Sequence, residues 1–262
     1  MTIIVRAAES VHWYRSEDGQ PQYTVKAKDG SDRPTTLRDA RKLNLVPSVT
    51  TVMKIAAKPG LDVWKNEQLL LAALTLPRVE GETEKEFIAR VVLDSKSTAK
   101  AAAERGTRVH ESIEAWYRGV RPVEHDDIAK GVEEAIFAHF KTHPFQKWET
   151  EVSFSHPLGF GGKTDLFTRP DESAPVGIML DAKTKEFGPD DEVPAYDEHL
   201  MQLAAYRIGV GMPHARCANV FASVSNPGLV KVKEWSEEEL RRGWAMFQAL
   251  LTFWQLKNKF GE

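Results

Sequence analysis

Residues 161–185 read GGKTDLFTRPDESAPVGIMLDAKTK and contain two apolar runs of strand length that each carry an acid. The first run holds Asp165, and the second holds Asp181 followed two positions later by Lys183. Because residues i and i+2 of a strand point to the same face, we expect Asp181 and Lys183 to lie side by side, with Ala182 on the opposite face. Pairing of the runs as a hairpin would bring Asp165 close to both. Two carboxylates and an ammonium group at the edge of a sheet are unfavourable unless they bind something, and a divalent metal ion is the simplest candidate.

A helix is predicted over residues 98–118, and it contains His110 and Glu114 four positions apart. Residues with this spacing share one face of a helix. Taken alone, the pair fits a solvent-exposed polar stripe, but it precedes the acidic hairpin in the same chain. One imidazole together with carboxylates can coordinate Mg²⁺ or Mn²⁺, and the nitrogen favours Mn²⁺. His110 and Glu114 are therefore candidate members of the same site.

Three more side chains extend the candidate site. Glu151 begins the first of three predicted strands, where it is either a member of the site or an ordinary edge-strand acid. Gln202 and Tyr206 lie four apart on a helix predicted over residues 196–210. Taken alone, this pair also fits a helix whose tyrosine packs in the core while its glutamine faces water.

The glycine-rich run at residues 161–164 does not predict a phosphate-binding loop. That loop requires a glycine at position 157, which is Pro157 here, and its lysine should open a helix. The residues after Lys163 instead predict a strand. Gly161 and Gly162 therefore indicate a strand entry whose backbone bends or is closely approached by other groups.

The order of the predicted elements indicates one α/β fold. Helices come first, a cluster of strands follows, and a helix, a hairpin and a last helix complete the chain, which predicts a central mixed β-sheet flanked by helices. We expect an N-terminal hairpin and helical elaboration in residues 1–97 and the sheet-containing core in residues 98–262. The helices are predicted at 37–42, 47–54, 61–74, 83–92, 98–118, 126–142, 196–210 and 236–257, and the strands at 151–155, 162–169, 176–183, 217–224 and 229–235, with a further hairpin before residue 27.

The composition excludes several classes of protein. No apolar run approaches the roughly 18 residues that a membrane span needs, and no signal peptide is evident. The single cysteine, Cys217, allows no internal disulfide or cysteine-held metal cluster, and we expect it in the core. These features predict a cytoplasmic protein. The net charge of −3 argues against coating nucleic acid by bulk attraction, but it is compatible with a nuclease whose acids are offset by bound cations.

Four short motifs occur in one order: Gly-Thr-Arg-Val-His110, Gly-Lys-Thr-Asp165, Asp181-Ala-Lys183 and Gln202-Leu-Ala-Ala-Tyr206. In this order and spacing, the chain resembles the RecB-like branch of the PD-(D/E)xK nuclease superfamily. It is similar to the mitochondrial genome maintenance exonucleases and their phage and bacterial relatives. The match covers about residues 98–212, and Pro47-Ser-Val-Thr-Thr-Val is similar to the leading segment of those exonucleases.

The resemblance implies a role for each matching position. Asp165, Asp181 and the main-chain carbonyl of Ala182 would ligate Mg²⁺ or Mn²⁺, and His110 would be an additional ligand. Lys183 would orient or help to deprotonate the attacking water. These roles agree with the chemistry, because hard cations prefer carboxylate and carbonyl oxygens, and a metal ion lowers the pKa of bound water. A lysine beside that water stabilises the developing charge.

Gln202 and Tyr206 would support the site and contact the DNA strand. The chain departs from the family in having Asp181 where many members have glutamate. It also lacks the cysteines that hold an iron–sulfur cluster in some RecB-like nucleases, which excludes those subgroups but not the fold.

The resemblance therefore implies a restriction-endonuclease-like nuclease core. It also implies a metal-dependent DNA exonuclease that hydrolyses phosphodiester bonds in DNA recombination, repair or replication. Its partners would be DNA and a recombination or single-strand-binding protein, in a bacterial or phage-infected host cell. Two alternatives remain: a catalytically silent DNA-binding or assembly protein on the same fold, and an endonuclease.

The retained acids and lysine favour an enzyme. Helices before residue 95 that could cover a strand end favour an exonuclease, with Trp13, Tyr14 or Trp64 as stacking surfaces. Aromatic residues of this kind are more often part of the core.

Overall fold

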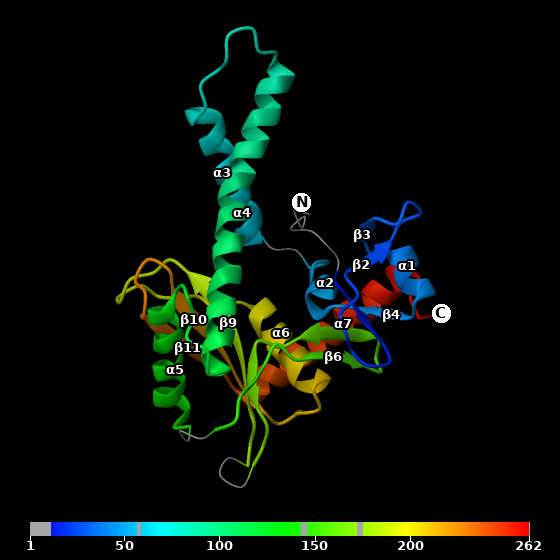
Figure 1. Ribbon diagram of the computed structural model, residues 1–262, viewed down its shortest axis with the longest axis vertical. Coiled ribbons are helices and arrows are strands. Elements are labelled where there is room, and N and C mark those ends of the chain that lie inside the picture. Colours follow the sequence, from blue (N-terminus) through cyan, green and yellow to red (C-terminus); the bar gives the residue numbers. More distant parts are fainter. Residues whose placement is uncertain (1–11, 57–58, 143–145, 172–174, 262) are drawn as a thin grey trace. The chain divides into compact units, whose positions relative to one another are not determined.

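The computed structural model describes residues 12–56, 59–142, 146–171 and 175–261 (Figure 1). Its internal contacts divide the chain into two compact units. One combines residues 1–55 with residues 109–262, and the other comprises residues 56–108. Every strand in the described residues belongs to the larger unit. The predicted boundary between residues 97 and 98 falls inside one long helix, α4 (Glu84–Tyr117).

The centre of the larger unit is a five-stranded sheet with the strand order β11-β10-β9-β8-β5. β9 and β10 run parallel, and the other neighbouring pairs in this sheet are antiparallel. The strands are β5 (Glu149–Thr150), β8 (Leu166–Thr168), β9 (Ile178–Lys185), β10 (Arg216–Ser223) and β11 (Val230–Trp235). This mixed sheet confirms the predicted α/β class, and β10 and β11 form the hairpin predicted near the C-terminus.

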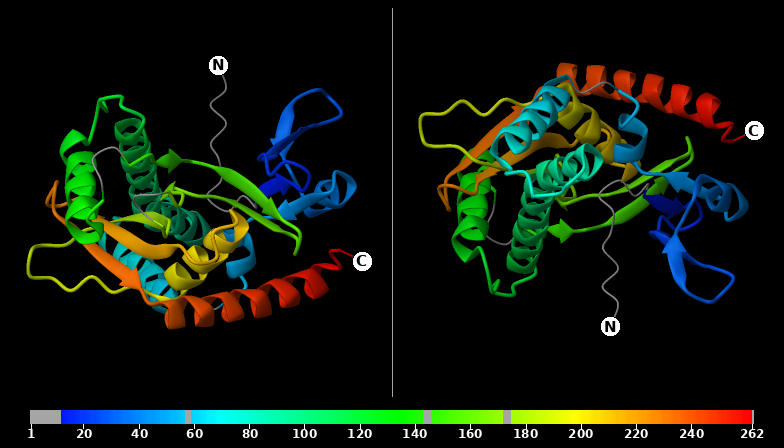
Figure 2. Two further views of the ribbon diagram at one scale, coloured as in Figure 1. Left: turned by 90° about the horizontal axis from the view of Figure 1, so that it is seen from below. Right: turned by 90° about the horizontal axis from the view of Figure 1, so that it is seen from above.

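Helices cover both faces of this sheet (Figure 2). They are α5 (Asp126–Phe140), α6 (Asp197–Gly209), α7 (Glu237–Asn258) and the part of α4 from Val109 onward. Leu180 and Ala182 of β9 pack with α4 and α5, whereas Met179 packs with α6 and α7. Because side chains alternate along a strand, Asp181 and Lys183 belong to the face covered by α6 and α7.

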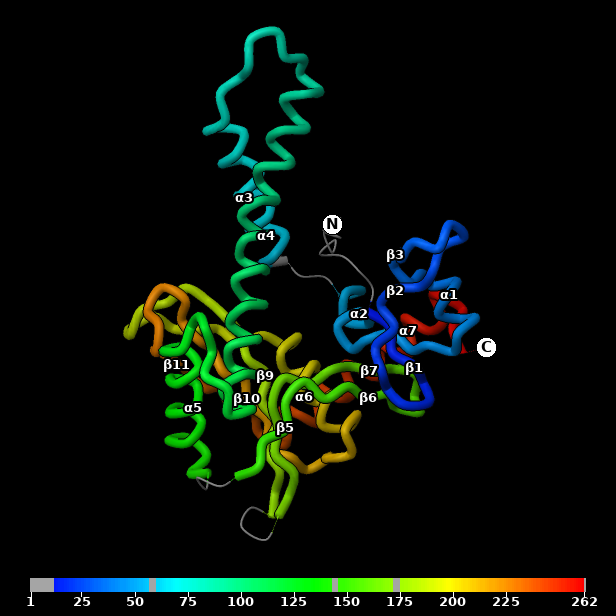
Figure 3. Tube along the Cα trace, in the orientation of Figure 1, coloured from blue at the N-terminus to red at the C-terminus, as the bar shows by residue number. Residues whose placement is uncertain are grey.

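The strand predicted over residues 162–169 is interrupted. Its first half pairs as a separate antiparallel hairpin that can be followed in Figure 3, and its second half enters the central sheet as β8. The hairpin strands are β6 (Ser153–His156) and β7 (Phe160–Lys163). At the junction, the Thr164 N–H donates to the Val152 carbonyl at 3.0 Å and the Glu151 N–H donates to the Asp165 carbonyl at 3.2 Å. Glu151, with a left-handed φ of 54°, lies between β5 and β6 and does not begin a strand as predicted.

The N-terminal strands pair differently from the prediction. β1 pairs with β4 and β2 pairs with β3. The predicted hairpin between the first two segments is present only as a short one, in which the Arg15 N–H donates to the Gln20 carbonyl and the Gln22 N–H donates to the Trp13 carbonyl, each at 2.8 Å. The strands are β1 (Trp13–Arg15), β2 (Thr24–Lys26), β3 (Asp32–Pro34) and β4 (Leu45–Pro47). Burial of Trp13 against Trp254 of α7 draws β1 into the core, and one bridge, between Tyr14 and Pro21, connects the two predicted arms. Residues 1–11, part of the predicted β structure, lie outside the described residues.

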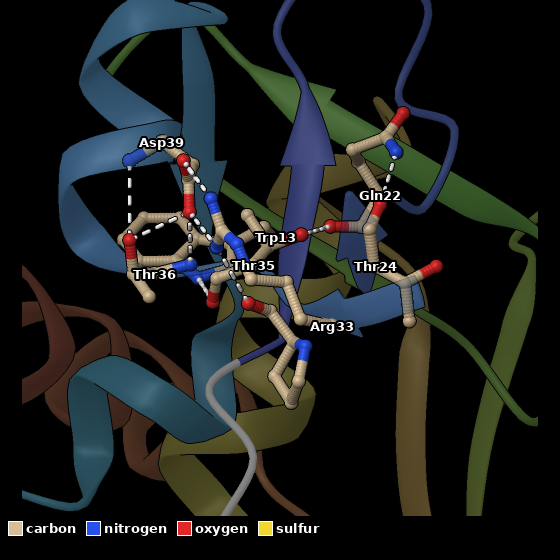
Figure 4. A network of polar contacts seen from close by, with 8 residues as sticks. Trp13, Gln22, Thr24, Arg33, Thr35, Thr36 and Asp39 are labelled. Carbon is tan, nitrogen blue, oxygen red and sulfur yellow. Dashed lines mark hydrogen bonds and ion pairs between the residues drawn. The ribbon is translucent and has the colours of Figure 1, made fainter. Parts of the chain in front are cut away.

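A polar network fixes this N-terminal segment (Figure 4). The indole N–H of Trp13 donates to the main-chain carbonyl of Thr35 at 3.2 Å, and the Thr35 hydroxyl donates to the Gln22 carbonyl at 2.8 Å. Arg33 donates two hydrogen bonds to Asp39 at 2.6 and 2.9 Å. The network holds the indole of Trp13 inside the larger unit, where it is 1% exposed and cannot serve as the stacking surface considered from the sequence.

Three helix starts agree with their sequence signals. The short helices are α1 (Leu37–Lys42) and α2 (Val49–Met53). α1 begins with a capping box between Thr36 and Asp39. α2 begins at Ser48, whose hydroxyl accepts a hydrogen bond from the Thr51 N–H at 3.0 Å. α7 begins with the predicted capping box at Ser236.

The smaller unit consists of α3 (Pro59–Thr75) and the part of α4 that precedes Val109. The separate helices predicted at 83–92 and 98–118 are one continuous helix. Ser95 and Ser97, which join them, donate their hydroxyls to main-chain carbonyls three residues earlier, a bond that a helix accommodates. Trp64 is partly exposed in this unit. None of the helices in the described ranges combines the length and apolar character that a bilayer crossing requires.

Candidate active site

The middle of β9 places an acid and a lysine side by side, as predicted. The Lys183 ammonium donates to the Asp181 carboxylate, with an Nζ–Oδ1 distance of 2.6 Å. The side chain of Asp181 is almost completely buried, whereas that of Lys183 is 27% exposed. The Lys183 ammonium therefore contacts a buried carboxylate while part of its own side chain remains accessible to solvent.

Asp165 joins this group from the start of β8. Its Oδ2 atom accepts a hydrogen bond from the main-chain N–H of Ala182 at 2.9 Å. This contact lies next to Leu166 and Leu180, the last residue pair of the β8–β9 ladder. Burial raises the pKa of the Asp165 carboxyl above its usual value, and the nearby Asp181 carboxylate adds to this increase. The charges of His110 and Lys183 act in the opposite direction. The hairpin thus brings Asp165 near Asp181 and Lys183, as predicted.

His110 approaches Asp165 from α4, with 3.5 Å between His110 Nδ1 and Asp165 Oδ2. Glu114 follows one turn later, and both side chains line a small cavity together with Asp165 and Ala182. The cavity measures about 20 Å³ and its other walls are mostly aliphatic side chains of α4, α5 and the sheet. The predicted helix face therefore does reach the acidic hairpin.

Glu114 and Glu151 both line this cavity, and each has a cationic partner. The carboxylate of Glu114 lies 2.6 Å from the guanidinium of Arg118. Glu151 forms an ion pair with Lys163 of β7. Because these contacts neutralise the two acids, Glu114 and Glu151 are less available to a cation than Asp165.

The charges around Lys183 favour the cationic form of its side chain. Burial lowers the pKa of its ammonium group, but the Asp181 and Asp165 carboxylates raise that pKa by more, and the net pKa lies above its usual value. A lysine in this state donates hydrogen bonds and stabilises negative charge, whereas it cannot accept a proton.

Gln202 and Tyr206 complete one side of the site from α6. The Gln202 carbonyl accepts from Lys183 Nζ at 3.3 Å, and the Gln202 amide donates to the Tyr206 hydroxyl at 3.1 Å. Tyr206 is 6% exposed, and its ring meets that of Phe154 edge-on at 5.8 Å. The predicted pair therefore shares a helix face and holds Lys183, with the tyrosine ring in the core.

The backbone at Gly161 and Gly162 is closely approached, as predicted from the glycine pair. A Cβ atom at Gly161 would lie 2.9 Å from the Tyr14 Cβ atom, and one at Gly162 would lie 2.9 Å from atoms of the Phe154 and Tyr206 rings. A side chain at Gly162 would displace the ring of Phe154 or Tyr206, and one at Gly161 would collide with the Phe154 carbonyl and with Tyr14. The glycines therefore serve the packing of the site.

Three residues near the site were not assigned a role from the sequence. Asn219 of β10 donates to Asp181 Oδ2 at 2.7 Å, and Trp235 donates its indole N–H to Asn219 Oδ1 at 2.8 Å. His199 of α6 is buried near Lys183, and burial lowers the pKa of its imidazole to about 4. A polar Asn219 in the apolar run Cys217–Ala222 was the available signal, but its partner depends on strand register.

The donor types fit Mg²⁺ or Mn²⁺. Among the residues that the structure describes, no group of three or more His, Cys, Asp or Glu side chains is gathered closely enough to hold a metal ion. Mg²⁺, however, is usually held by one or two carboxylates together with water and substrate phosphates. Asp165 and Asp181 provide two carboxylates, and His110 provides a nitrogen 3.5 Å from one of them. These three residues and the Ala182 carbonyl are the groups that would hold the ion.

Comparisons with known proteins identify no family. No family model matches the chain, and no curated protein matches it. A solved structure described as "Crystal structure of SSO0001" is similar over 72% of this chain and 86% of its own, at 16% sequence identity. The TM-score of that match is 0.29, which is too low to identify a shared fold.

Proposed function

We propose that this chain is a metal-dependent deoxyribonuclease with a PD-(D/E)xK-type core of the RecB-like branch, and that it acts as an exonuclease. The observation that carries the proposal is the grouping of Asp165, Asp181 and Lys183 at one end of the β8–β9 pair. Two carboxylates and a charged lysine that meet across two strands are suited to hydrolysis of a phosphodiester by water. His110 reaches the same group from α4.

Each residue has a chemical role in this proposal. A bound Mg²⁺ or Mn²⁺ would lower the pKa of water and neutralise charge on the phosphate. Asp165 and Asp181 would hold the ion through their carboxylates. Lys183, kept as a cation by these acids, would donate hydrogen bonds to the attacking water and to the phosphate oxygen on which charge develops. Gln202 would keep the Lys183 ammonium pointed at that position.

The central test measures digestion of end-labelled single-stranded DNA, end-labelled duplex DNA and closed circular plasmid, each with Mg²⁺, Mn²⁺ or EDTA. We expect metal-dependent release of nucleotides from labelled ends and no nicking of the circle. Asp165→Ala and Lys183→Ala should each abolish this release. Lys26→Ala is the matched control, because Lys26 of β2 forms an ion pair with Asp32 of β3 and both residues lie outside the candidate site.

The possible outcomes separate the alternatives. Equal digestion by the wild type, Asp165→Ala and Lys183→Ala would show that the site is assigned to the wrong residues. Nicking of the circular plasmid would identify an endonuclease. DNA binding without any metal-dependent digestion would favour the catalytically silent DNA-binding protein.

A further inference from the structure

Asn219 is a fully buried polar residue in the middle of β10. In the parallel pairing of β10 with β9, it lies opposite Asp181, and its side-chain nitrogen donates to Asp181 Oδ2 at 2.7 Å. The Lys183 ammonium lies 2.6 Å from both carboxylate oxygens of Asp181 and donates a hydrogen bond to Oδ1, the oxygen that Asn219 does not contact. Because both oxygens are held, the carboxylate cannot rotate without breaking a buried hydrogen bond.

Trp235, the last residue of β11, decides which way the Asn219 amide points. Its indole N–H donates to Asn219 Oδ1 at 2.8 Å. An indole nitrogen is only a donor, so the amide oxygen must face Trp235 and the amide nitrogen must face Asp181. Without this N–H, a rotated amide would place its oxygen against the Asp181 carboxylate, where two acceptors repel each other.

We propose that Asn219 and Trp235 are positioning residues of the candidate nuclease site, which fix the Asp181 carboxylate and, through it, the Lys183 ammonium. This inference rests on the proposed function. The connected hydrogen bonds support it, since they run from Trp235 through Asn219 and Asp181 to Lys183 and end at Gln202. A buried amide that served packing alone could be replaced by an apolar side chain without leaving a partner unsatisfied, whereas here both neighbours need it.

The decisive variant is Trp235→Phe, which removes the indole N–H and keeps an aromatic ring. Outer partners of metal ligands typically change metal affinity or activity by about 10–100-fold when they are mutated. We expect Trp235→Phe to lower kcat and weaken Mn²⁺ binding by about tenfold, and Asn219→Ala to do so by up to about 100-fold. The KM for DNA should stay within about twofold, because neither residue reaches the substrate. Asn219→Ser, which keeps a donor, should recover part of what Asn219→Ala loses.

Trp13→Phe is the matched control. The Trp13 indole is also buried and also donates one hydrogen bond, to the Thr35 carbonyl at 3.2 Å (Figure 4). It should lower the thermal midpoint about as much as Trp235→Phe does, with kcat and Mn²⁺ affinity unchanged. A role of Trp235 in packing alone would make the two variants equivalent in all three measurements.

The experiment combines steady-state digestion of end-labelled DNA, thermal unfolding, and calorimetric titration of Mn²⁺ into the folded chain without DNA. Wild-type kcat and Mn²⁺ affinity in both Trp235→Phe and Asn219→Ala would overturn the positioning role and leave the proposed nuclease standing. A wild-type chain that neither digests DNA nor binds Mn²⁺ would overturn the proposed function, and the positioning role with it. Weakened Mn²⁺ binding in the variants would support the role even if the right DNA substrate were missing from the assay.

Discussion

The two faces of β9 are built in opposite ways. On the face covered by α6 and α7, Asp181 and Asn219 are fully buried, and each polar side-chain atom of this pair has a partner. On the face covered by α4 and α5, His110 and Asp165 keep side-chain exposures of 30% and 20% beside a small cavity. The buried face fixes groups in place, and the open face leaves a carboxylate available for exchange with water or ligand. The proposed hydrolysis would use both properties.

The strongest test of this contrast removes one acid from the buried face. Asp181→Asn would leave the Lys183 ammonium without its counter-charge and would place an amide among donors. Loss of one partner of a buried ion pair costs about 3–5 kcal/mol of unfolding free energy. Chemical denaturation should show a loss in this range. A loss below about 1 kcal/mol would mean that Lys183 is satisfied by water or Gln202, and the two faces would differ less than described.

The stability of the fold at acid pH tests the buried face through His199. Burial and the charge of Lys183 lower the pKa of the His199 imidazole from 6.5 to about 4, so the folded chain binds this proton less tightly than the unfolded chain. The stabilisation is therefore present above pH 6.5 and is lost as the pH falls from 6.5 towards 4, by about 3 kcal/mol in total. In His199→Gln, the free energy of unfolding should change much less than in the wild type as the pH falls from 6.5 to 4. If the pH dependence of the unfolding free energy were unchanged in the variant, the acid sensitivity would belong to other groups.

The acid on the open face should respond in the opposite direction. Burial raises the pKa of Asp165, so ionisation of this group destabilises the fold as the pH rises above the usual aspartate range. Asp165→Asn should therefore be more stable than the wild type at pH 8 by about 1 kcal/mol, equivalent to a rise in thermal midpoint of roughly 2–4 °C. The gain should vanish near pH 4, where the wild-type group is protonated. Melting curves at both pH values test this, and a variant that is less stable at pH 8 would contradict it.

The smallest effect belongs to Glu114 at the rim of the cavity. Its ion pair with Arg118 is an i, i+4 pair with 58% exposure of the arginine side chain. Such pairs contribute about 0.3–0.5 kcal/mol. Glu114→Gln should therefore change stability by no more than about 0.5 kcal/mol, and digestion by no more than a few-fold. A loss of digestion comparable with that of Asp165→Ala would make Glu114 a metal ligand and would move the functional centre further into the cavity.

Local spacing was sufficient to predict one group of contacts. The i, i+2 spacing placed Asp181 beside Lys183, and the i, i+4 spacing placed Gln202 beside Tyr206, as the hydrogen bonds between them show. These contacts follow from the geometry of single elements, which the sequence pattern specifies directly.

Contacts that depend on pairing between distant segments were not predictable in this way. The sequence contains no signal for the register that sets Asn219 opposite Asp181, and β1 pairs with β4 even though the nearer β2 has an equally suitable pattern. The break between β7 and β8 at Asp165 is another such feature, since the Asp165 carboxylate accepts a hydrogen bond from the Ala182 N–H of the neighbouring strand. The sequence therefore indicated the acids, the lysine and Gln202, but not Asn219 and Trp235.

The parallel pairing of β9 with β10 has a consequence for the order in which the chain folds. Parallel neighbours require a crossover connection, and here that connection contains α6. Asp181 meets Asn219 across 38 positions, and Lys183 meets Gln202 only when α6 has packed. Long-range pairings of this kind form slowly. A chain that is still emerging during synthesis can therefore pair β8 with β9 before Asn219 and Gln202 hold Asp181 and Lys183, and the proposed cutting activity would be withheld until the sheet is complete.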